Sequence, residues 1–166
     1  GRATTPRRAV ELAIVSIEEF LENHYLAYKK QRPLFIFFGS EENYMDDSII
    51  KKYSINVGKL NEKELALLFN IADFGLAFSL TNHNLVSAEM NACGLKVIEL
   101  DVPSTKHLSN NKLIERVKPS PYLIAESINN NFTNLVESKN NNQVQANNSW
   151  ENNLNNVLSF IDKNCQ

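Results

Sequence analysis

The chain has 166 residues, of which 43% are apolar and 22% charged, values typical of one globular domain and not of a disordered or fibrous protein. The net charge of -2 argues against a general nucleic-acid binder. No apolar stretch reaches the roughly 20 residues that cross a bilayer, and we expect no signal peptide. Cys93 and Cys165 form no CxxC pair, so we interpret them as reduced thiols of a cytoplasmic protein.

The first predicted element is a long helix at residues 6–30. Thr5 is the expected N-cap and Pro6 the first helical residue. The residues of its apolar face recur at helical spacing: Val10, Ala13, Ile14, Ile17, Phe20, Leu21 and Tyr25. A short apolar strand at residues 34–38 follows, because Pro33 stops the helix and Gly39 closes the strand.

The middle of the chain alternates between helices and strands. A weaker helix is predicted at residues 46–52 and a strand at residues 54–58. Asn61 and Glu64 form a capping box before an apolar run, which predicts a helix over residues 62–72. The run "FGLAFSL" predicts a strand that is buried on both faces. A short helix from Asn84 to Cys93 then ends at Gly94, and "LKVIEL" is the next strand.

The last part of the chain is predicted to contain a short strand at residues 114–117 and a helix after Pro121. The asparagines from Asn129 to Asn148 indicate a polar surface segment. We therefore divide the chain into a domain at residues 2–137, a mobile asparagine-rich segment at 138–148 and a helix at 149–166. That final helix has one apolar side, formed by Trp150, Leu154, Val157, Leu158 and Ile161.

The strict alternation of helices and strands predicts an α/β fold with a doubly wound, Rossmann-like parallel sheet. Such sheets bind ligands at the carboxyl ends of their strands. The stretch "SLTNHNLVSAEMNACGLKVIELD", residues 79–101, leaves a buried strand at this edge and enters a helix. A helix N-terminus in this position favours an anionic ligand.

Several familiar chemistries are excluded by spacing. The sequence has no GxGxxG motif, no P-loop and no GxSxG elbow. His24, His83 and His107 are too scattered for a metal site. Asp46 and Asp47 could form an acidic metal-binding pair, but acidic residues are also usual at a helix start, and we favour that interpretation.

Two runs carry a family resemblance. "GKLNEKELALLFNIADFGLAFSL" followed by "SAEMNACGLKVIELDV" resembles the C-terminal domain of GT-B glycosyltransferases of family 4. "GRATTPRRAVELAI" is similar to the start of this domain in relatives that include bacterial rhamnosyltransferases of surface glycans. The resemblance implies the C-terminal half of a GT-B fold, which binds the nucleotide-sugar donor. The acceptor-binding half would lie in a missing N-terminal domain, so this chain alone should bind without catalysing.

The resemblance assigns a role to Glu89, whose position in the family contacts the ribose hydroxyls of the donor nucleotide. An ionised carboxylate suits this task because it accepts two hydroxyl donors at once. Many relatives have a second glutamate eight residues earlier, where this sequence has Thr81. The role beside the transferred sugar then falls to Thr81, Asn82 or His83, or is absent. The candidate catalytic residues are Glu89 and His83.

Phosphate binding is expected at two helix starts. Arg2, Arg7 and Arg8 surround the first turn of the first helix, where cations are unfavourable unless an anion is present. The resemblance favours Arg2 for the donor diphosphate, with Arg7 or Arg8 as the second cation. The other start follows Asn84, where the free amides of Leu85, Val86 and Ser87 face the donor.

The base of the nucleotide is expected beside Val57, Gly58 and Lys59, which follow a strand and offer backbone groups. GT-B enzymes generally use cations and helix dipoles in place of a metal, so we expect no metal and no cofactor. The expected partners are a nucleotide diphosphate sugar and the acceptor-binding domain, and no nucleic acid. The expected location is the cytoplasm, with peripheral association at the inner membrane face through the full-length protein as an open alternative.

Two other functions fit the same fold. One is a non-catalytic module that senses a nucleotide sugar or phosphosugar. The other is a signalling receiver domain, which needs a phosphoacceptor aspartate at the end of a strand. Asp73 precedes its strand, so the receiver is the weaker alternative.

Overall fold

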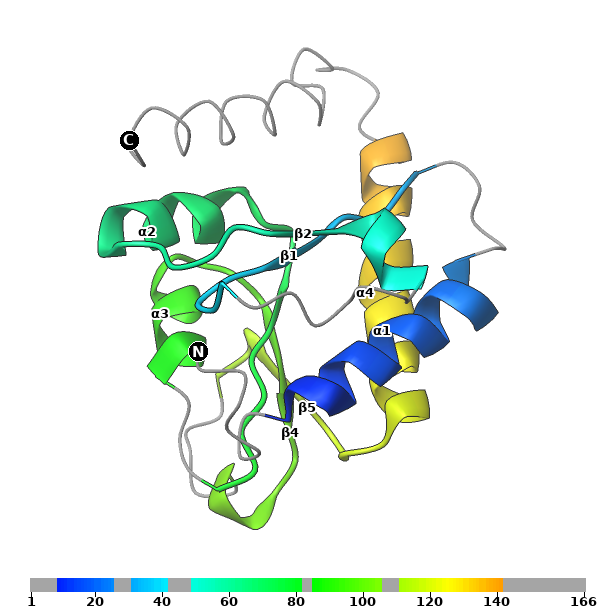
Figure 1. The fold of residues 1–166 in the computed structure, drawn as a ribbon. Helices are drawn as coiled ribbons and strands as arrows, with labels where there is room; N and C mark the ends of the chain where they lie inside the picture. Colours follow the sequence, from blue (N-terminus) through cyan, green and yellow to red (C-terminus); the bar gives the residue numbers. More distant parts are fainter. Residues whose placement is uncertain (1–8, 26–30, 42–48, 82–84, 106–110, 142–166) are drawn as a thin grey trace.

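The computed structural model describes residues 9–25, 31–41, 49–81, 85–105 and 111–141 (Figure 1). Its longer helices are α1 (Val10–Asn23), α2 (Glu62–Ile71), α3 (Leu85–Ala92) and α4 (Pro121–Asn141). The strands are β1 (Phe35–Phe37), β2 (Ser54–Asn56), β3 (Gly75–Leu76), β4 (Val97–Leu100) and β5 (Ile114–Val117), and the 3₁₀ turns are η3 (Ile49–Tyr53) and η4 (Pro103–Thr105). Helices and strands alternate along the chain as predicted.

All of the paired strands run parallel. β1 pairs with β2, and β3, β4 and β5 form a second hydrogen-bonded set in that order. The registers align Ile36 with Ile55, and Glu99 with Arg116. The prediction of a Rossmann-like α/β fold with parallel strands is therefore confirmed.

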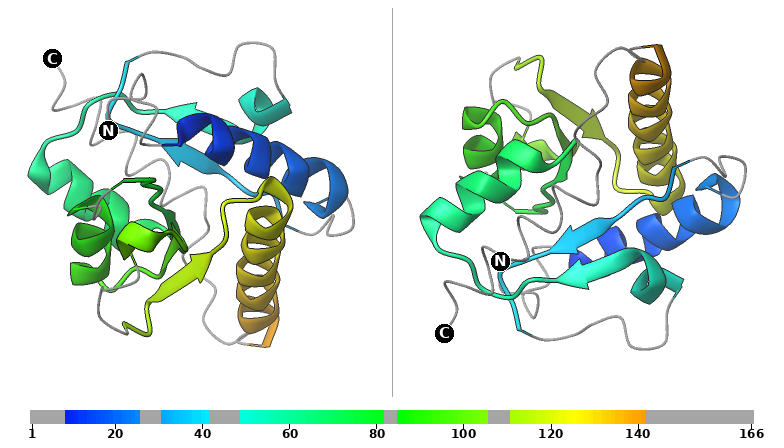
Figure 2. Two further views of the ribbon diagram at one scale, coloured as in Figure 1. Left: turned by 90° about the horizontal axis from the view of Figure 1, so that it is seen from below. Right: turned by 90° about the horizontal axis from the view of Figure 1, so that it is seen from above.

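The strands lie between two layers of helices, with α1 and α4 on one side and α2 and α3 on the other (Figure 2). Successive side chains of a strand point to opposite faces of the sheet, so they pack alternately against the two helix layers. In β1, Phe35 and Phe37 pack in the cluster with α1 and α4, while Ile36 packs in the cluster with α2 and α3. In β4, Ile98 and Val97 divide in the same way.

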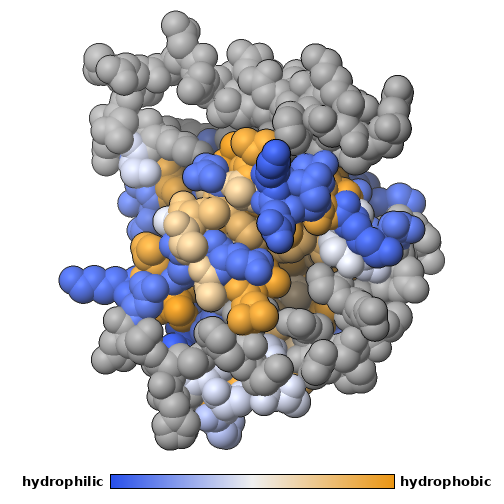
Figure 3. Space-filling model, turned by 90° about the vertical axis from the view of Figure 1, so that its left-hand side faces the viewer, coloured by the Kyte–Doolittle hydropathy of each residue, from blue (hydrophilic) through white to orange (hydrophobic). Residues whose placement is uncertain are grey.

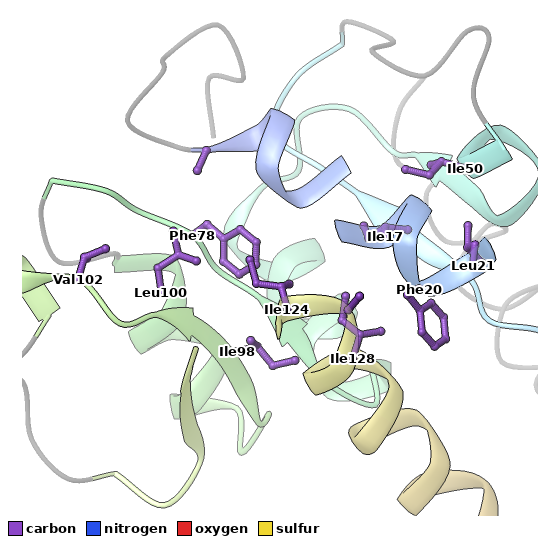
Figure 4. Close-up of a cluster of buried hydrophobic side chains, with 12 residues drawn as sticks. Ile17, Phe20, Leu21, Ile50, Phe78, Ile98, Leu100, Val102, Ile124 and Ile128 are labelled. Carbon is purple, nitrogen blue, oxygen red and sulfur yellow. The ribbon is translucent and has the colours of Figure 1, made fainter. Parts of the chain in front are cut away.

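The larger core lies between α1, α4 and the strands (Figure 4). The fully buried side chains at its centre come from several elements: Ile17, Phe20 and Leu21 from α1, Ile50 from η3, Ile98 and Leu100 from β4, and Ile124 and Ile128 from α4. The ring of Phe20 packs edge-on against those of Phe35 and Phe132, at centroid distances of 6.1 and 5.7 Å. Burial of a side chain of this size stabilises the fold by about 1.5–3 kcal/mol.

Local sequence signals account for two helices. Asn61 accepts hydrogen bonds from the amides of Lys63 and Glu64, and the Glu64 carboxylate accepts one from the Asn61 amide. This confirms the predicted capping box of α2. After α3, Gly94 adopts a left-handed φ of 79°, which confirms it as the residue that ends that helix.

The first helix is shorter than predicted. Ala9 has a left-handed conformation, with φ 48° and ψ 41°, so a helix continuing from Pro6 through this residue is wrong, and α1 begins at Val10. Thr5 and Pro6 themselves lie outside the described residues. The helix ends at Asn23 and not at Lys30, and just beyond it the ring of Tyr25 packs against Tyr53 at 5.3 Å. This contact holds the chain after α1 against η3 and the core.

Two further elements differ from the prediction. Where a helix was expected at 46–52, the described part is the 3₁₀ turn η3, which buries Ile50 completely. α4 continues to Asn141, so residues 138–141, assigned to the polar segment, are helical. The expectation that Asn129 to Asn131 lie in a surface segment is wrong for Asn131, a residue of α4 whose side chain is buried and donates a hydrogen bond to Glu115. Residues 142–166 lie outside the described part of the chain.

Candidate functional site

The helix that carries Glu89 is held tightly between β3 and β4. Gly75 in β3 lies directly against Met90 of α3, with no side chain between them. At the other end, the Asn91 side chain donates to the Leu95 carbonyl at 3.2 Å, and Asn111 donates to Asn91 at 2.6 Å. Together with the left-handed Gly94, these contacts fix the position of α3 on the sheet.

Along α3 the side chains divide into an outward and an inward set. Glu89 is exposed, and its carboxylate has no hydrogen-bond or salt-bridge partner within the described part of the chain. Ser87 and Met90 are buried, and among the described residues the Ser87 hydroxyl has no hydrogen-bond partner. Glu89 is therefore the ionisable side chain that α3 presents at its surface.

The exposure of the side chains also differs among the first three residues of α3. Leu85 is 70% exposed and Val86 is half-buried, whereas Ser87 has no exposed surface. Of the three amides predicted to face a donor, those of Leu85 and Val86 belong to residues at the surface. Asn82, His83 and Asn84 lie outside the described residues. Thr81 is described, and it is exposed.

The loops after β1 and β2 form one hydrogen-bonded unit. The Gly39 amide donates to the Gly58 carbonyl at 2.6 Å, and the Asn56 side chain donates to the Ser40 carbonyl at 3.0 Å. The Gly58 amide donates to Asn56 Oδ1 at 3.0 Å, and the positive φ of Gly58, 67°, permits this turn. Both backbone groups of Gly58, predicted to meet a base, thus already bond within the protein.

Lys59, the next of the residues predicted to lie beside the base, is exposed, and its Nζ lies 3.7 Å from the Glu41 carboxylate. Both side chains are more than three-quarters exposed, so the ion pair contributes little to stability. Its amine can therefore exchange this partner for an anionic ligand at small cost.

The beginning of α1 reaches the carboxyl ends of β3 and β4. Ala9 is buried in the same cluster as Phe78, which follows β3, and Val102, which follows β4. Within the described part of the chain, no side chain caps the first turn of α1, and Ala9 at the N-cap has no group that could do so. Arg2, Arg7 and Arg8 lie outside the described residues, and the chain that carries them leads directly into Ala9.

Two charged clusters inside the fold were not predicted. Glu99 is 2% exposed, and its carboxylate lies 3.8 Å from Nε of Arg116, its register partner on β5. Buried charged side chains are usually found in pairs, and Arg116 supplies the opposite charge here. The charged residues within the otherwise apolar strand runs "KVIEL" and "IERV" were the available sequence signal.

The second cluster surrounds Glu115 on the opposite face of the sheet. Its carboxylate accepts hydrogen bonds from the Ser127 hydroxyl and, at 3.0 Å, from the Asn131 side chain, and lies 2.9 Å from Lys96 Nζ. Burial acts to raise the pKa of Glu115, but these hydrogen bonds and the charge of Lys96 outweigh it and lower the pKa below its ordinary value. This cluster joins β5 to α4.

The described residues contain no group of three or more histidine, cysteine, aspartate or glutamate side chains arranged to hold a metal ion. In the same part of the chain, no helix is long and apolar enough to span a membrane. Cys93 carries a free thiol.

Comparison with protein families shows which family the chain resembles. The model described as "WsaF, C-terminal domain" matches residues 1–129, which includes every described element except the later part of α4. The comparison with curated proteins found no match.

Proposed function

Because the chain belongs to the WsaF C-terminal domain family, a family of glycosyltransferase-associated domains, we propose that it is the donor-binding half of a GT-B glycosyltransferase. WsaF itself is a rhamnosyltransferase. In this proposal, the chain holds a nucleotide diphosphate sugar at the carboxyl edge of its strands. A second, acceptor-binding domain completes the enzyme, and the product is a bacterial surface polysaccharide or glycan.

The observation that carries this proposal is the placement of Glu89. It stands in the second turn of a helix that follows the carboxyl end of β3, it is exposed, and its carboxylate has no side-chain partner among the described residues. Such a carboxylate can accept hydrogen bonds from two neighbouring ribose hydroxyls without a change of protonation. The ribose of a donor bound at this edge is the ligand group that it fits best.

The expected positions of the diphosphate, the base and the transferred sugar follow from the placement of Glu89. The diphosphate would lie at the start of α3, beside the exposed residue Leu85, together with Arg2 and either Arg7 or Arg8. The base would lie near Lys59, beside the joined loops that follow β1 and β2. The transferred sugar would lie toward Thr81, Asn82 and His83, which precede α3.

One feature favours a second candidate function. Thr81 stands where many family 4 relatives have a glutamate close to the transferred sugar. A protein without that carboxylate could bind a nucleotide sugar as a sensor without transferring it. Turnover by the full-length protein separates these functions, because a sensor would bind the donor and release it unchanged.

Calorimetry with a panel of nucleoside diphosphates and nucleotide sugars tests the proposal directly. We expect at least one member to bind the chain in the presence of a chelator, since arginines and helix amides neutralise the diphosphate. Binding that requires added Mg²⁺ would contradict the assigned phosphate site. A chain that binds none of the panel would contradict donor binding altogether.

A further inference from the structure

One face of α2 exposes large apolar side chains. Leu67 and Ile71, one helical turn apart, are 44% and 40% exposed, while Leu68 and Phe69 of the same helix are buried. Figure 3 shows the side of the molecule on which α2 and α3 lie, where hydrophobic surface lies among hydrophilic groups. Among the described residues, no other helix exposes two large apolar side chains at this spacing.

The same chain contains a segment that has the complementary pattern. In residues 149–166, Trp150, Leu154, Val157, Leu158 and Ile161 recur at helical spacing, and the positions between them are mostly asparagine, serine and charged residues. This segment lies outside the described residues, so the pattern is known from the sequence alone. A helix with such a stripe is stable in water only when the stripe is covered.

A short connection joins the end of α4 to this segment. α4 ends at Asn141, and residues 142–149 lead to Trp150. These eight residues span at most about 26–29 Å when extended. α2 and the carboxyl-terminal end of α4 both lie in the upper half of the molecule in Figure 1.

We propose that residues 149–166 form an amphipathic helix that docks on the exposed face of α2 in the same chain. Its apolar stripe would cover Leu67 and Ile71, with the helices packed side by side as in other helix pairs. A tether of eight residues gives an effective concentration in the millimolar range, which favours this segment over a second copy of the chain. The proposal does not depend on donor binding.

Trp150 makes the docking directly measurable, because it is the one tryptophan in the chain. In the complete protein, its fluorescence emission should be shifted to the blue and poorly quenched by acrylamide. The double variant Leu67→Asn, Ile71→Asn should shift the emission to the red and increase the quenching rate constant several-fold. Far-UV circular dichroism should show that the domain remains folded, because both side chains are at the surface.

A matched control is Val15→Asn, which changes a side chain of similar exposure, 46%, on α1 in the opposite helix layer. It should leave the fluorescence of Trp150 unchanged. Leu154→Asn tests the other partner and should release Trp150 as the α2 variant does, and combining the two changes should add little. If the α2 variant fails to fold, Leu154→Asn alone still tests whether the segment docks through its apolar stripe.

Three results would overturn the proposal. Trp150 could be as accessible to acrylamide in the native protein as in urea, which would mean that the segment is not docked. The α2 variant could be folded and still protect Trp150, which would place the segment elsewhere. Protection of Trp150 that is lost on dilution would identify a second copy of the chain as the partner.

Discussion

Gly75 and Met90 approach each other so closely that a Cβ on Gly75 would lie 2.5 Å from Sδ and 3.2 Å from Cε of Met90. No side chain fits in this space, so glycine allows α3 to lie directly on β3. Because Glu89 precedes Met90 in α3, this contact also sets the height of the candidate ribose-binding carboxylate above the sheet. Packing in the core and geometry at the candidate site are therefore coupled at one glycine.

Gly75→Ala should destabilise the domain by about 1–3 kcal/mol, the usual range for overpacking a core. The added methyl group must displace the buried end of Met90 or the whole of α3. Urea unfolding measures the loss. In a Met90→Ala background the same change should be less destabilising, and an equal effect in both backgrounds would show that the two residues do not compete for space.

Glu89→Gln should preserve the fold and weaken binding of a nucleoside diphosphate by about 10- to 150-fold, because hydrogen bonds to charged groups contribute about 1.5–3 kcal/mol. A 2′,3′-dideoxy ligand should bind wild type and variant nearly alike. Calorimetry measures both. Glu22→Gln removes an exposed carboxylate at the far end of α1 and serves as the control. A folded Glu89 variant that binds the intact nucleotide normally would assign Glu89 to the helix surface alone.

Arg7→Ala combined with Arg8→Ala should weaken diphosphate binding far more than nucleoside binding, because the interaction removed is with phosphate. The same ligands are compared by calorimetry. Lys51→Ala with Lys52→Ala removes two positive charges at the opposite, amino end of β2 and should have little effect. Equal loss of both ligands in the arginine variant would indicate a structural role for the pair.

Stability should fall in acid partly through Glu115. Its pKa is lowered in the folded protein from an ordinary value of 4.5, so near this pH the unfolded chain binds more protons than the folded one. The stabilisation by Glu115 is therefore complete above the unfolded pKa and is lost as the pH falls through the lower, folded pKa.

Urea unfolding at several pH values checks this prediction. Between about pH 5 and 3, Glu115→Gln should show a shallower dependence of stability on pH than wild type. Glu126→Gln, which changes an exposed carboxylate on α4, should retain the wild-type slope. A Glu115 variant with the wild-type slope would show that this cluster does not carry the acid sensitivity.

Local signals in the sequence were sufficient where the interaction is itself local. The capping box of Asn61 and Glu64 joins residues three apart, and the left-handed Gly94 requires only the absence of a side chain. The strand β5 was also predicted correctly, at residues 114–117, and is found at Ile114–Val117. The alternation of these elements determined the parallel α/β fold, because parallel strands must be joined by crossovers.

Tertiary contacts decided what local patterns could not. Asparagine-rich sequence indicated a surface segment, yet Asn131 is buried because its side chain meets Glu115, sixteen residues away on β5. Ala9 adopts a left-handed conformation at the start of α1, where it packs in the core near the ends of β3 and β4, and no residue type signals this. On α3, periodicity could not tell that Ser87 is enclosed while Glu89 faces outward, because only the docking of the helix on β3 and β4 fixes its rotation.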